Sequence, residues 1–502
     1  MQHQKRLSWL VSFAFSFSLF CISGGAVTGQ DASGNANDIG LNLHEIRVKQ
    51  ENVPGVVSLG TFRVYEDREK ASGRIIEVDV AVLHALGQNP RPDPVFILEG
   101  GPGLASVRSF ASPGNTALRK TRDVVLVNQR GTAGPNALTC ETSGSDEDIQ
   151  SYLGPILIAE LFEKCEKVLS KRANLALYST PIAMDDLNDI RAALAYEKIN
   201  IIGKSYGSRA TQVYLRRHPD TVRSAILNGV VALENTTPLY HAESAQFAID
   251  RIFELCSKDV DCSAAYPNPA SELKVVLKRL EREPATVEVS HPITKLPVTV
   301  TLSRDAFAGA LRLFLYGLPG NFEVPKLINK AFNKEYTPFA ERGMYSGKGV
   351  REALAFGMFL SVGCSEDGDR IDLKKIDSLT KDTFLGASRV RDQMASCEVW
   401  PRSQIQDGFG DMPQIDVPVL LISGTLDPVT PPYWGERAAA TLTNSFHMIV
   451  PGAHVARDQC SYSIMEEFLA TASTEGLDLS CVKGITFPPF SLPASFRESV
   501  NE

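Results

Sequence analysis

Apolar and polar positions alternate near the start of the chain and then give way to continuous apolar runs. Segments 60–67 and 74–83 alternate on either side of a turn-like stretch at Lys70–Gly73, which predicts an antiparallel hairpin. Helix-like stretches follow at Ala183–Tyr196 and Ser208–Arg217, among runs that are apolar throughout. Such runs are typical of strands covered on both faces of a sheet: Pro94–Leu98, Val124–Val127, Ile199–Ile202 and Ser224–Leu227. This order of strands and helices predicts an α/β fold with a mostly parallel, doubly wound sheet.

The alternation of strands and helices stops after Val231 and resumes at Val417. Between these points helical periodicity dominates, and only Thr286–Leu302 has a β-rich pattern. The expected helices are Glu243–Cys256, Ser271–Leu280, Arg304–Leu315, Pro325–Phe332 and Glu352–Val362. The simplest explanation is a helical block inserted between strands of one sheet. We therefore expect a core at 30–231 and 413–502, with a mainly helical insertion at 232–412.

The first residues have the pattern of a secretory signal peptide. Lys5 and Arg6 precede an apolar run at Leu7–Ile22, which is followed by the small residues Ser23–Ala26. The run contains serines and is short for a membrane span, which needs about 20 apolar residues. An uncleaved N-terminal anchor is the alternative. We expect residues 1–29 to be removed, leaving an exported protein, periplasmic or secreted, without a stable membrane anchor.

Composition and charge narrow the class of protein without identifying a partner. The chain has 502 residues, of which 43% are hydrophobic and 22% charged, which excludes collagen-like, disordered and polytopic membrane proteins. Its 51 Lys and Arg against 59 Asp and Glu give a formal net charge of −8. The sequence has no cluster of basic residues of the kind found in nucleic-acid-binding proteins, so we expect no nucleic-acid partner. The oligomeric state is left open.

The cysteines indicate disulfides in an oxidising compartment. The sequence has 9, and removal of Cys21 with the leader leaves an even number, which is typical of a disulfide framework in an exported protein. The sequence has no paired C-x-x-C spacing of the kind that binds zinc. We expect neither a metal nor a cofactor. Many pairings are possible, and sequential neighbours close the shortest loops. The remaining cysteines are Cys140, Cys165, Cys256, Cys262, Cys364, Cys397, Cys460 and Cys481.

A candidate nucleophile lies where an expected strand turns into a helix. Gly203-Lys-Ser205-Tyr-Gly207 matches the G-x-S-x-G pattern in the strand–turn–helix context that this motif requires. The turn is so tight that side chains on either side of the serine would collide, which explains the two glycines. The alternative is a glycine-rich turn that binds phosphate at the helix N-terminus. The segment matches neither the Walker pattern nor G-x-G-x-x-G.

A serine hydroxyl needs a base, and the base needs an orienting acid. His454 follows a Pro-Gly-Ala loop just beyond the expected strand Phe446–Val450, and Asp427 lies just after the strand Val417–Ile422. Both positions are at carboxyl ends of strands, where α/β sheets place reactive groups, and their order after Ser205 suits this motif. The alternatives are a surface histidine and a helix N-cap.

Other residues could in principle supply the base or the acid. His447 lies inside an expected strand, which favours a structural role. Asp458, four residues beyond His454, is a weaker alternative for the acid.

The same chemistry requires backbone N–H groups where negative charge develops on the substrate oxygen. One donor should be Tyr206, directly after the serine. The other should come from Glu99–Gly103, which follows the strand Pro94–Leu98, and Gly101 is our candidate. A plain Gly/Pro turn is the alternative for this segment.

Taken together, these motifs resemble the proline iminopeptidase-like serine peptidases of the α/β-hydrolase superfamily, above all the exported tripeptidyl aminopeptidases of bacteria. They are Gly100-Gly-Pro-Gly103, Asn128-Gln-Arg-Gly131, Gly203-Lys-Ser-Tyr-Gly207, Gly424-Thr-Leu-Asp-Pro428 and Gly452-Ala-His454. The resemblance implies an α/β-hydrolase fold with a helical cap at about 232–412. It also implies release of residues or short peptides from a peptide with a free N-terminus.

The resemblance further implies roles for residues outside the motifs. Acidic cap residues recognise the substrate's amino group in that family, and Glu366, with Asp367 second, matches this region; a solvated acidic loop is the alternative. The implied disulfides are Cys140–Cys165, Cys256–Cys262, Cys364–Cys397 and Cys460–Cys481. The chain departs from the family at Glu99, where histidine is frequent, and at Asn128, where aspartate is frequent.

Two other functions are compatible with the motifs. An ester hydrolase could use the same Ser205, Asp427 and His454, because one such site can cleave both kinds of bond. A non-catalytic binding protein could retain the scaffold. The complete set of three groups favours an enzyme.

Overall fold

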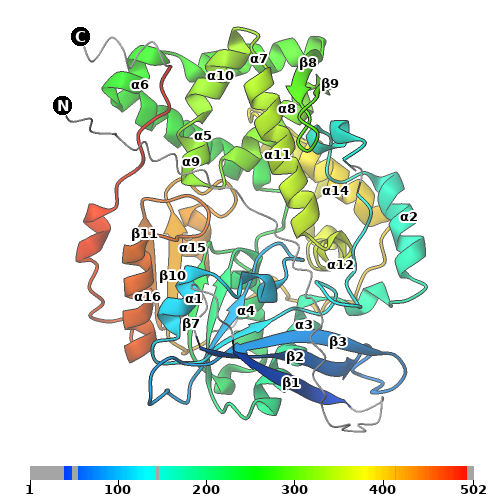
Figure 1. The fold of residues 1–502 in the computed structure, drawn as a ribbon, viewed down its shortest axis with the longest axis vertical. Helices are drawn as coiled ribbons and strands as arrows, with labels where there is room; N and C mark the ends of the chain where they lie inside the picture. The colour runs from blue at the N-terminus through cyan, green and yellow to red at the C-terminus, as the bar shows by residue number, and fades with distance from the viewer. Residues whose placement is uncertain (1–38, 48–54, 143–145, 413, 494–502) are drawn as a thin grey trace, which may run out of the picture. The chain divides into compact units, whose positions relative to one another are not determined.

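One nine-stranded sheet forms the centre of the fold (Figure 1). The structure is a computed structural model that describes residues 39–47, 55–142, 146–412 and 414–493. The expected signal peptide and Cys21 lie outside the described residues. The strand order is β1-β2-β3-β5-β4-β6-β7-β10-β11. The strands are β1 (Gly40–Arg47), β2 (Val56–Tyr65), β3 (Ile75–Leu83), β4 (Val95–Leu98), β5 (Val124–Val127), β6 (Ile199–Lys204), β7 (Val222–Asn228), β10 (Val419–Gly424) and β11 (Ser445–Val450).

The α/β-hydrolase fold expected from the sequence is confirmed. Strands β5, β4, β6, β7, β10 and β11 pair in parallel, and β2 and β3 form the expected antiparallel hairpin. Strand β1, which the sequence analysis did not identify, pairs antiparallel with β2 and extends the sheet. The acid-bearing strand β10 lies between β7 and β11, although a long segment separates it from β7 in the sequence.

Both faces of the sheet are buried, which explains the uninterrupted apolar runs. In β4, Phe96 and Leu98 belong to one apolar cluster, whereas Val95 and Ile97 belong to another. Helices α3 and α4 contribute to the first cluster, and α16 contributes to the second. The helices outside the insertion are α1 (Pro113–Leu118), α2 (Ala159–Leu169), α3 (Thr180–Ala193), α4 (Tyr206–Arg217), α15 (Pro432–Ala439) and α16 (Gln459–Thr471).

A mainly helical inserted region, residues 229–418, connects β7 to β10. Its helices α5 to α11 and the hairpin β8–β9 form an apolar cluster largely of their own, whereas α12 packs into the cluster of the sheet. The elements are α5 (His241–Lys258), α6 (Val260–Ala265), α7 (Pro269–Arg282), β8 (Ala285–Ser290), β9 (Pro297–Leu302), α8 (Arg304–Phe314), α9 (Leu318–Asn321), α10 (Val324–Phe332), α11 (Thr337–Ala353), α12 (Phe356–Glu366), α13 (Ile376–Thr380) and α14 (Ser388–Glu398).

The prediction of one continuous helix over Glu352–Val362 is wrong. Helix α11 ends at Ala353, Leu354 is extended, and α12 begins at Phe356. Leu354 forms an antiparallel bridge with Leu104, which interrupts the helical hydrogen bonds. This pairing is between segments far apart in the sequence, so the local periodicity does not contain it.

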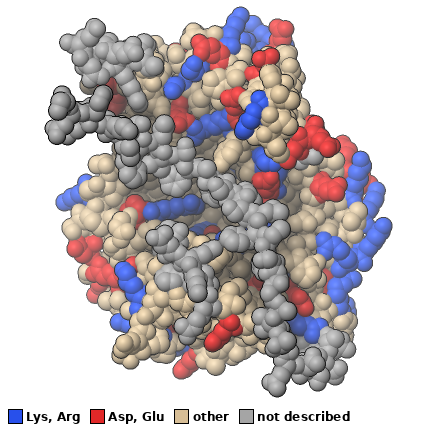
Figure 2. Space-filling view, viewed as in Figure 1, with Lys and Arg blue, Asp and Glu red and all other residues tan. Residues whose placement is uncertain are grey.

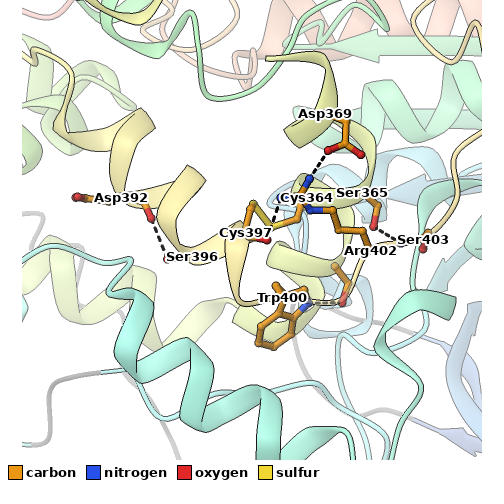
Figure 3. The surroundings of a disulfide bond; sticks show 10 residues. Cys364, Ser365, Asp369, Asp392, Ser396, Cys397, Trp400, Arg402 and Ser403 are labelled. Carbon is orange, nitrogen blue, oxygen red and sulfur yellow. Dashed lines mark hydrogen bonds and ion pairs between the residues drawn. A yellow bond between two sulfur atoms is a disulfide. The ribbon is translucent and has the colours of Figure 1, made fainter. Parts of the chain in front are cut away.

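The four disulfides match the pairings implied by the family resemblance: Cys140–Cys165, Cys256–Cys262, Cys364–Cys397 and Cys460–Cys481. Cys364–Cys397 joins α12 to the last turn of α14 (Figure 3). Next to it, Trp400 Nε1 donates to Ser361 Oγ at 3.0 Å, and Ser403 N donates to Ser365 Oγ at 2.8 Å. These contacts fix the segment after α14 against α12.

Charged side chains of both signs are intermixed on the face of the molecule in Figure 2. In the portion of the chain that the structure describes, none of the helices has the length and apolar character needed to cross a bilayer.

Candidate active site

Ser205 occupies a strained turn between β6 and α4. Its φ of 54° and ψ of −124° lie in a region that L-residues rarely adopt. Its N–H donates to Asn228 O at 2.9 Å. A Cβ at Gly203 would lie 2.3 Å from Gly207 O, and one at Gly207 would lie 2.1 Å from Leu98 O. The two motif glycines are therefore required by close backbone contacts, as the sequence analysis predicted.

Asp427 and His454 meet at the carboxyl edge of the sheet. Asp427 follows β10 and is fully buried, and His454 follows β11 with its side chain 7% exposed. His454 Nδ1 donates to Asp427 Oδ2 at 2.8 Å. This bond orients the imidazole so that its other nitrogen, Nε2, is left to act as a base.

Asp427 is held as an anion by several donors. The backbone N–H groups of Val429 and Thr430 donate to its Oδ1, both at 2.8 Å, and Thr430 Oγ1 donates to Oδ2 at 2.7 Å. Burial alone would raise the pKa of Asp427, but the charge and hydrogen bond of His454 and the bonds from Thr430 hold that pKa below its usual value. The carboxylate therefore stays ionised at neutral pH.

Asn228 connects the candidate nucleophile to the loop of the candidate base. Its backbone oxygen accepts the Ser205 N–H, and its side chain makes two bonds to Ala456, with Oδ1 accepting from N at 2.8 Å and Nδ2 donating to O at 3.0 Å. The next residue, Gly229, lies against the imidazole, where a Cβ would be 3.3 Å from His454 Cε1. Ser205 and His454 thus lie on either side of one turn at the end of β7.

The glycine-rich loop after β4 lies directly against the serine. A Cβ at Gly100 would be 2.9 Å from Ser205 Cβ and 3.4 Å from Ser205 Oγ. Gly101 is the next residue after Gly100 in this loop. Tyr206 is the first residue of α4, so the Tyr206 N–H has no hydrogen-bond partner within the helix. The residues expected to supply the two oxyanion-hole donors therefore lie on either side of Ser205, one in the loop after β4 and one in the first turn of α4.

The inserted region supports this loop through backbone contacts. Ala355 N donates to Gly103 O at 3.1 Å, next to the Leu104–Leu354 bridge. A Cβ at Gly101, whose φ is 111°, would lie 3.1 Å from Leu354 Cδ2. The start of α12 therefore fixes the position of the candidate oxyanion loop.

Glu99, a departure from the resembled family, has a partner in the structure. Lys204 Nζ lies 2.8 Å from Glu99 Oε1, and both side chains are mostly buried. Because Lys204 directly precedes Ser205, this ion pair ties the oxyanion loop to the serine turn. Asn128, the second departure, donates through Nδ2 to Asp79 Oδ2 at 2.8 Å and accepts from Val107 N.

Glu366 lies at the end of α12 and is 1% exposed. Its Oε1 accepts the Thr180 N–H at 2.6 Å, at the start of α3, whereas its Oε2 is buried without a hydrogen-bond partner. Burial raises the pKa of Glu366 to about 7, although the charge of Arg209 and the Thr180 bonds act in the opposite direction.

Asp367 has a different environment from Glu366. One of its oxygens pairs with Arg209 at 2.7 Å and the other with Arg370 at 2.8 Å. The alternative of a solvated acidic loop does not describe these two residues, because both are buried. Glu366 has a carboxylate oxygen left for a further donor, and Asp367 binds two arginines.

The candidate recognition group is linked to the serine turn through Tyr206. The Tyr206 hydroxyl lies 2.6 Å from Thr180 Oγ1 and donates to Gln129 Oε1 at 3.1 Å. Burial first, and then the negative charge of Glu366, raise the pKa of this hydroxyl. The residue after Ser205 and the buried carboxylate therefore belong to one polar network around Thr180.

The two weaker sequence alternatives have structural partners. Asp458 caps α16 by accepting from Ser461 N at 2.8 Å and from Ser461 Oγ at 2.7 Å. His447 lies 2.9 Å from Ser423 Oγ, and burial lowers its pKa. Neither residue is joined to Asp427 or to His454 by a hydrogen bond within the described parts of the chain.

Sequence reasoning missed several residues of this site. The contact of Thr430 with Asp427 could have been predicted from the sequence, since a hydroxyl three residues after an aspartate can donate a hydrogen bond to its carboxylate. Asn228 and Lys204 end strands next to the motif, but their bonds depend on distant loops. Tyr316, from the inserted region, packs edge-on against His454 with ring centroids 5.3 Å apart. No local signal identifies that contact.

Comparisons with known proteins find α/β-hydrolase family models and peptidase relatives. A model described as alpha/beta hydrolase fold matches residues 93–262, and one described as TAP-like protein matches residues 382–481. The serine protease Hip1 of Mycobacterium tuberculosis is 24% identical over 429 residues, which cover 79% of this chain and 81% of Hip1. The tripeptidyl aminopeptidase of Streptomyces lividans is 27% identical over 201 residues, 36% of each chain.

A crystal structure of proline iminopeptidase from Mycobacterium smegmatis aligns with a TM-score of 0.41 and 15% identity, covering 82% of this chain and 98% of that chain. The family match described as alpha/beta hydrolase fold agrees with the mostly parallel sheet of the structure. The chain is a serine hydrolase of the α/β-hydrolase fold, with relatives that are named as peptidases.

Proposed function

We propose that this enzyme is an exported aminopeptidase that releases residues or short peptides from free peptide N-termini. The observation that carries the proposal is the buried Oε2 of Glu366, which has no hydrogen-bond partner. A carboxylate oxygen in a dry site is costly to leave unpaired. A substrate ammonium group would satisfy it with a charge-assisted hydrogen bond. The relatives named as a serine protease and a tripeptidyl aminopeptidase also support peptide substrates.

In the proposed mechanism, Ser205 Oγ attacks the scissile carbonyl and His454 Nε2 accepts its proton. Asp427 fixes the imidazole and stabilises its protonated form. The N–H groups of Gly101 and Tyr206 bind the negative oxygen of the tetrahedral intermediate. His454 then protonates the leaving amine, an acyl-enzyme remains, and water repeats the sequence to release the N-terminal product.

We further propose that residues 232–412 act as a cap over this site and that the core consists of 30–231 and 413–502. Export is supported by the four disulfides, since disulfides persist in oxidising compartments. The residues proposed as the leader, 1–29, would be absent from the mature enzyme. The proposed location is the periplasm or the medium.

The test is a screen of matched substrates with the full mature chain. Alanyl and tripeptidyl anilides with a free amino group should be cleaved, and their N-acetylated counterparts should not. Ser205→Ala should lower kcat for the free substrates by several orders of magnitude without changing the unfolding temperature. Equal cleavage of free and acetylated anilides would contradict the aminopeptidase proposal. Turnover of short acyl esters alone would favour an ester hydrolase.

A further inference from the structure

Two arginines of the inserted region form no ion pair among the described residues, and one of them, Arg312, lies near the candidate active site. Arg312 is near the end of α8, and Arg389 is in the first turn of α14. Arg312 is buried and Arg389 is partly buried, and arginines in such environments are normally paired with carboxylates. Among the described residues, neither guanidinium forms an ion pair, and each has a buried nitrogen without a hydrogen-bond partner: Nε of Arg312 and Nη1 of Arg389.

The hydrogen bonds of Arg312 hold its guanidinium in place but do not neutralise its positive charge. The residue is 7% exposed, and its Nη2 donates to Tyr316 Oη at 2.8 Å and lies 3.3 Å from His241 Nδ1. Burial, followed by the charge of Arg312, lowers the pKa of His241 well below its usual value, so this imidazole is a neutral acceptor. Both partners are uncharged, and the positive charge of Arg312 remains.

Arg389 is in an environment that disfavours a cation. It lies at the N-terminal end of α14, where the helix dipole is positive. Burial, and then the nearby charge of Arg312, lower its pKa to about 10, so it still carries a proton at neutral pH. The negative charge of Asp392, one turn further along α14, acts in the opposite direction, although the two side chains form no ion pair among the described residues. The guanidinium lies 5.9 Å from the ring of Phe359.

Arg312 is close to the candidate base. The guanidinium of Arg312 lies 5.3 Å from the ring centroid of Tyr316, and that ring packs against His454 with centroids 5.3 Å apart. One aromatic ring therefore separates the arginine from the candidate base. Helix α14, which carries Arg389, is bonded to α12 by Cys364–Cys397 (Figure 3), and α12 ends at Glu366.

We propose that Arg312 and Arg389 form a binding site for a carboxylate of the peptide substrate. Each of the two guanidinium groups has a buried nitrogen without a hydrogen-bond partner and forms no ion pair among the described residues, so an anion would supply the missing acceptor, and their fork-like donors match a carboxylate. The rule that buried charged groups are paired is often broken at functional sites. The carboxylate is either the C-terminus of a short peptide or an acidic side chain near the scissile bond.

The inference rests on the proposed aminopeptidase function and extends it. Glu366 would bind the positive end of the substrate, and the arginine pair would bind a negative group on the other side of the scissile bond. A site with both features prefers short peptides with free ends, or peptides with an acidic residue after the cleaved bond.

The experiment compares Arg389→Met with the unaltered enzyme on matched peptides. With tri-alanine as the free acid, kcat/KM should fall by at least about 30-fold, the loss typical of removing one partner of a buried charge pair. With tri-alanine amide it should change little. If the amides of Ala-Asp-Ala and Ala-Asn-Ala differ instead, the bound group is a side chain. Equal losses on anionic and neutral peptides would overturn the inference.

Control variants separate binding from folding. Arg391→Met removes a neighbouring arginine on α14 that is exposed and paired with Asp377, and it should leave all kcat/KM values unchanged. Arg389→Lys retains the charge and should keep part of the preference for free acids. Each variant should react with a fluorophosphonate at the rate of the unaltered enzyme, which shows that Ser205 and its surroundings are intact.

A labelling experiment tests the arginine site without peptide cleavage. Tri-alanine should protect Ser205 from the fluorophosphonate more strongly than its amide does, and Arg389→Met should abolish that difference. If no peptide is cleaved but this difference is found, the proposed function fails and the carboxylate site stands. If peptides are cleaved but free acid and amide protect equally, the proposed function stands and the carboxylate site fails.

Discussion

Individual hydrogen bonds determine the ionisation of Asp427 and the orientation of His454. Asp427 is fully buried, and His454, Val429 and Thr430 all donate to it. Thr430 Oγ1 also lies 3.3 Å from His454 Nδ1, so one hydroxyl borders both members of the pair. A buried carboxylate that loses a donor becomes less stable as an anion and holds the imidazole less firmly.

Thr430→Val should therefore lower kcat by about 10-fold to 100-fold, the cost of a hydrogen bond to a charged group. KM should change little, because Thr430 does not contact the proposed amine or carboxylate sites. Thr430→Ser keeps the hydroxyl and should retain most of the activity. Steady-state kinetics on an alanyl anilide measures both variants. A KM effect equal in size to the kcat effect would show that Thr430 acts on binding instead.

The departure from the family at Asn128 also has an explanation at this scale. Its amide donates to Asp79 Oδ2 and accepts from Val107 N, so it bonds a carboxylate and a backbone N–H at once. Aspartate at this position would place two carboxylates at hydrogen-bond distance, and like charges at that separation repel. Asn128 thus suits Asp79 of this chain.

Glu366 should make peptide recognition depend on pH. Its pKa, raised by burial to about 7, means that the acid form predominates below pH 7 in the free enzyme and the anion above it. Binding of an ammonium group requires the anion. The ratio of kcat/KM for an alanyl anilide to that for a neutral acyl ester should fall as pH falls through about 7. Because both substrates react through the same Ser205 and His454, the ratio isolates the recognition of the amino group.

Glu366→Gln is the matched variant for this measurement. The glutamine can still accept the Thr180 N–H, so α3 keeps its bond. The ratio should then be low at every pH and should not change between pH 5 and 9. A ratio that still falls below pH 7 in this variant would assign the pH dependence to another group.

At the scale of elements, the position of α12 links the sheet to the insertion. Its first residues bond the glycine-rich loop, its last residue is Glu366, and Cys364 fixes it to α14. The oxyanion loop, the amine site and the arginine site are therefore all connected to one helix. Helices α5 to α11 have an apolar cluster largely separate from that of the sheet.

Removal of the Cys364–Cys397 disulfide should affect both stability and recognition. The two cysteines are 33 residues apart, and a bridge closing a loop of this size contributes roughly 2–4 kcal/mol to the free energy of unfolding. The double serine variant should show that loss in denaturant unfolding and a raised KM for free peptides. The matched control is Cys256→Ser with Cys262→Ser, a bridge over 6 residues.

This control bridge lies between α5 and α6, away from the proposed binding groups. It closes a shorter loop, so its removal should cost less stability. It should leave KM unchanged. A similar rise of KM in both variants would mean that general loosening, rather than the position of α12 against α14, weakens peptide binding.

For the whole molecule, each disulfide closes a local loop, with separations from 6 to 33 residues. Two lie within the inserted region, and two lie in the segments that flank it. Apolar packing and hydrogen bonds, rather than covalent bridges, therefore hold the insertion on the sheet. All eight cysteines of the four bridges follow residue 139, well beyond the expected leader.

Export can be checked on the mature protein by intact mass and thiol titration. The exported enzyme should lack about 29 N-terminal residues, as a signal peptide of usual length predicts. It should show no reactive thiol when unfolded without reductant, and one thiol for each of the eight paired cysteines after reduction. A ninth thiol, together with the full-length mass, would show that Cys21 and the leader are retained.

The sequence by itself determined the order of strands and helices, the turn around Ser205 and the positions of Asp427 and His454. These features depend on neighbours in the chain: apolar runs, two glycines and loops directly after strands. Parallel strands end at one edge of a sheet, so local position is enough to bring such loops together. The hairpin β2–β3 was predictable for the same reason, because its strands are adjacent in the sequence.

Only the tertiary structure decided which groups surround that edge. Leu354 leaves its helix to pair with Leu104, and Tyr316 packs against His454 across a long separation in sequence. Among the described residues, Arg312, Arg389 and Glu366 each have one buried polar atom without a hydrogen-bond partner, which is a property of their surroundings. Burial and the absence of a partner arise when distant segments pack together, and no local pattern of residues records them.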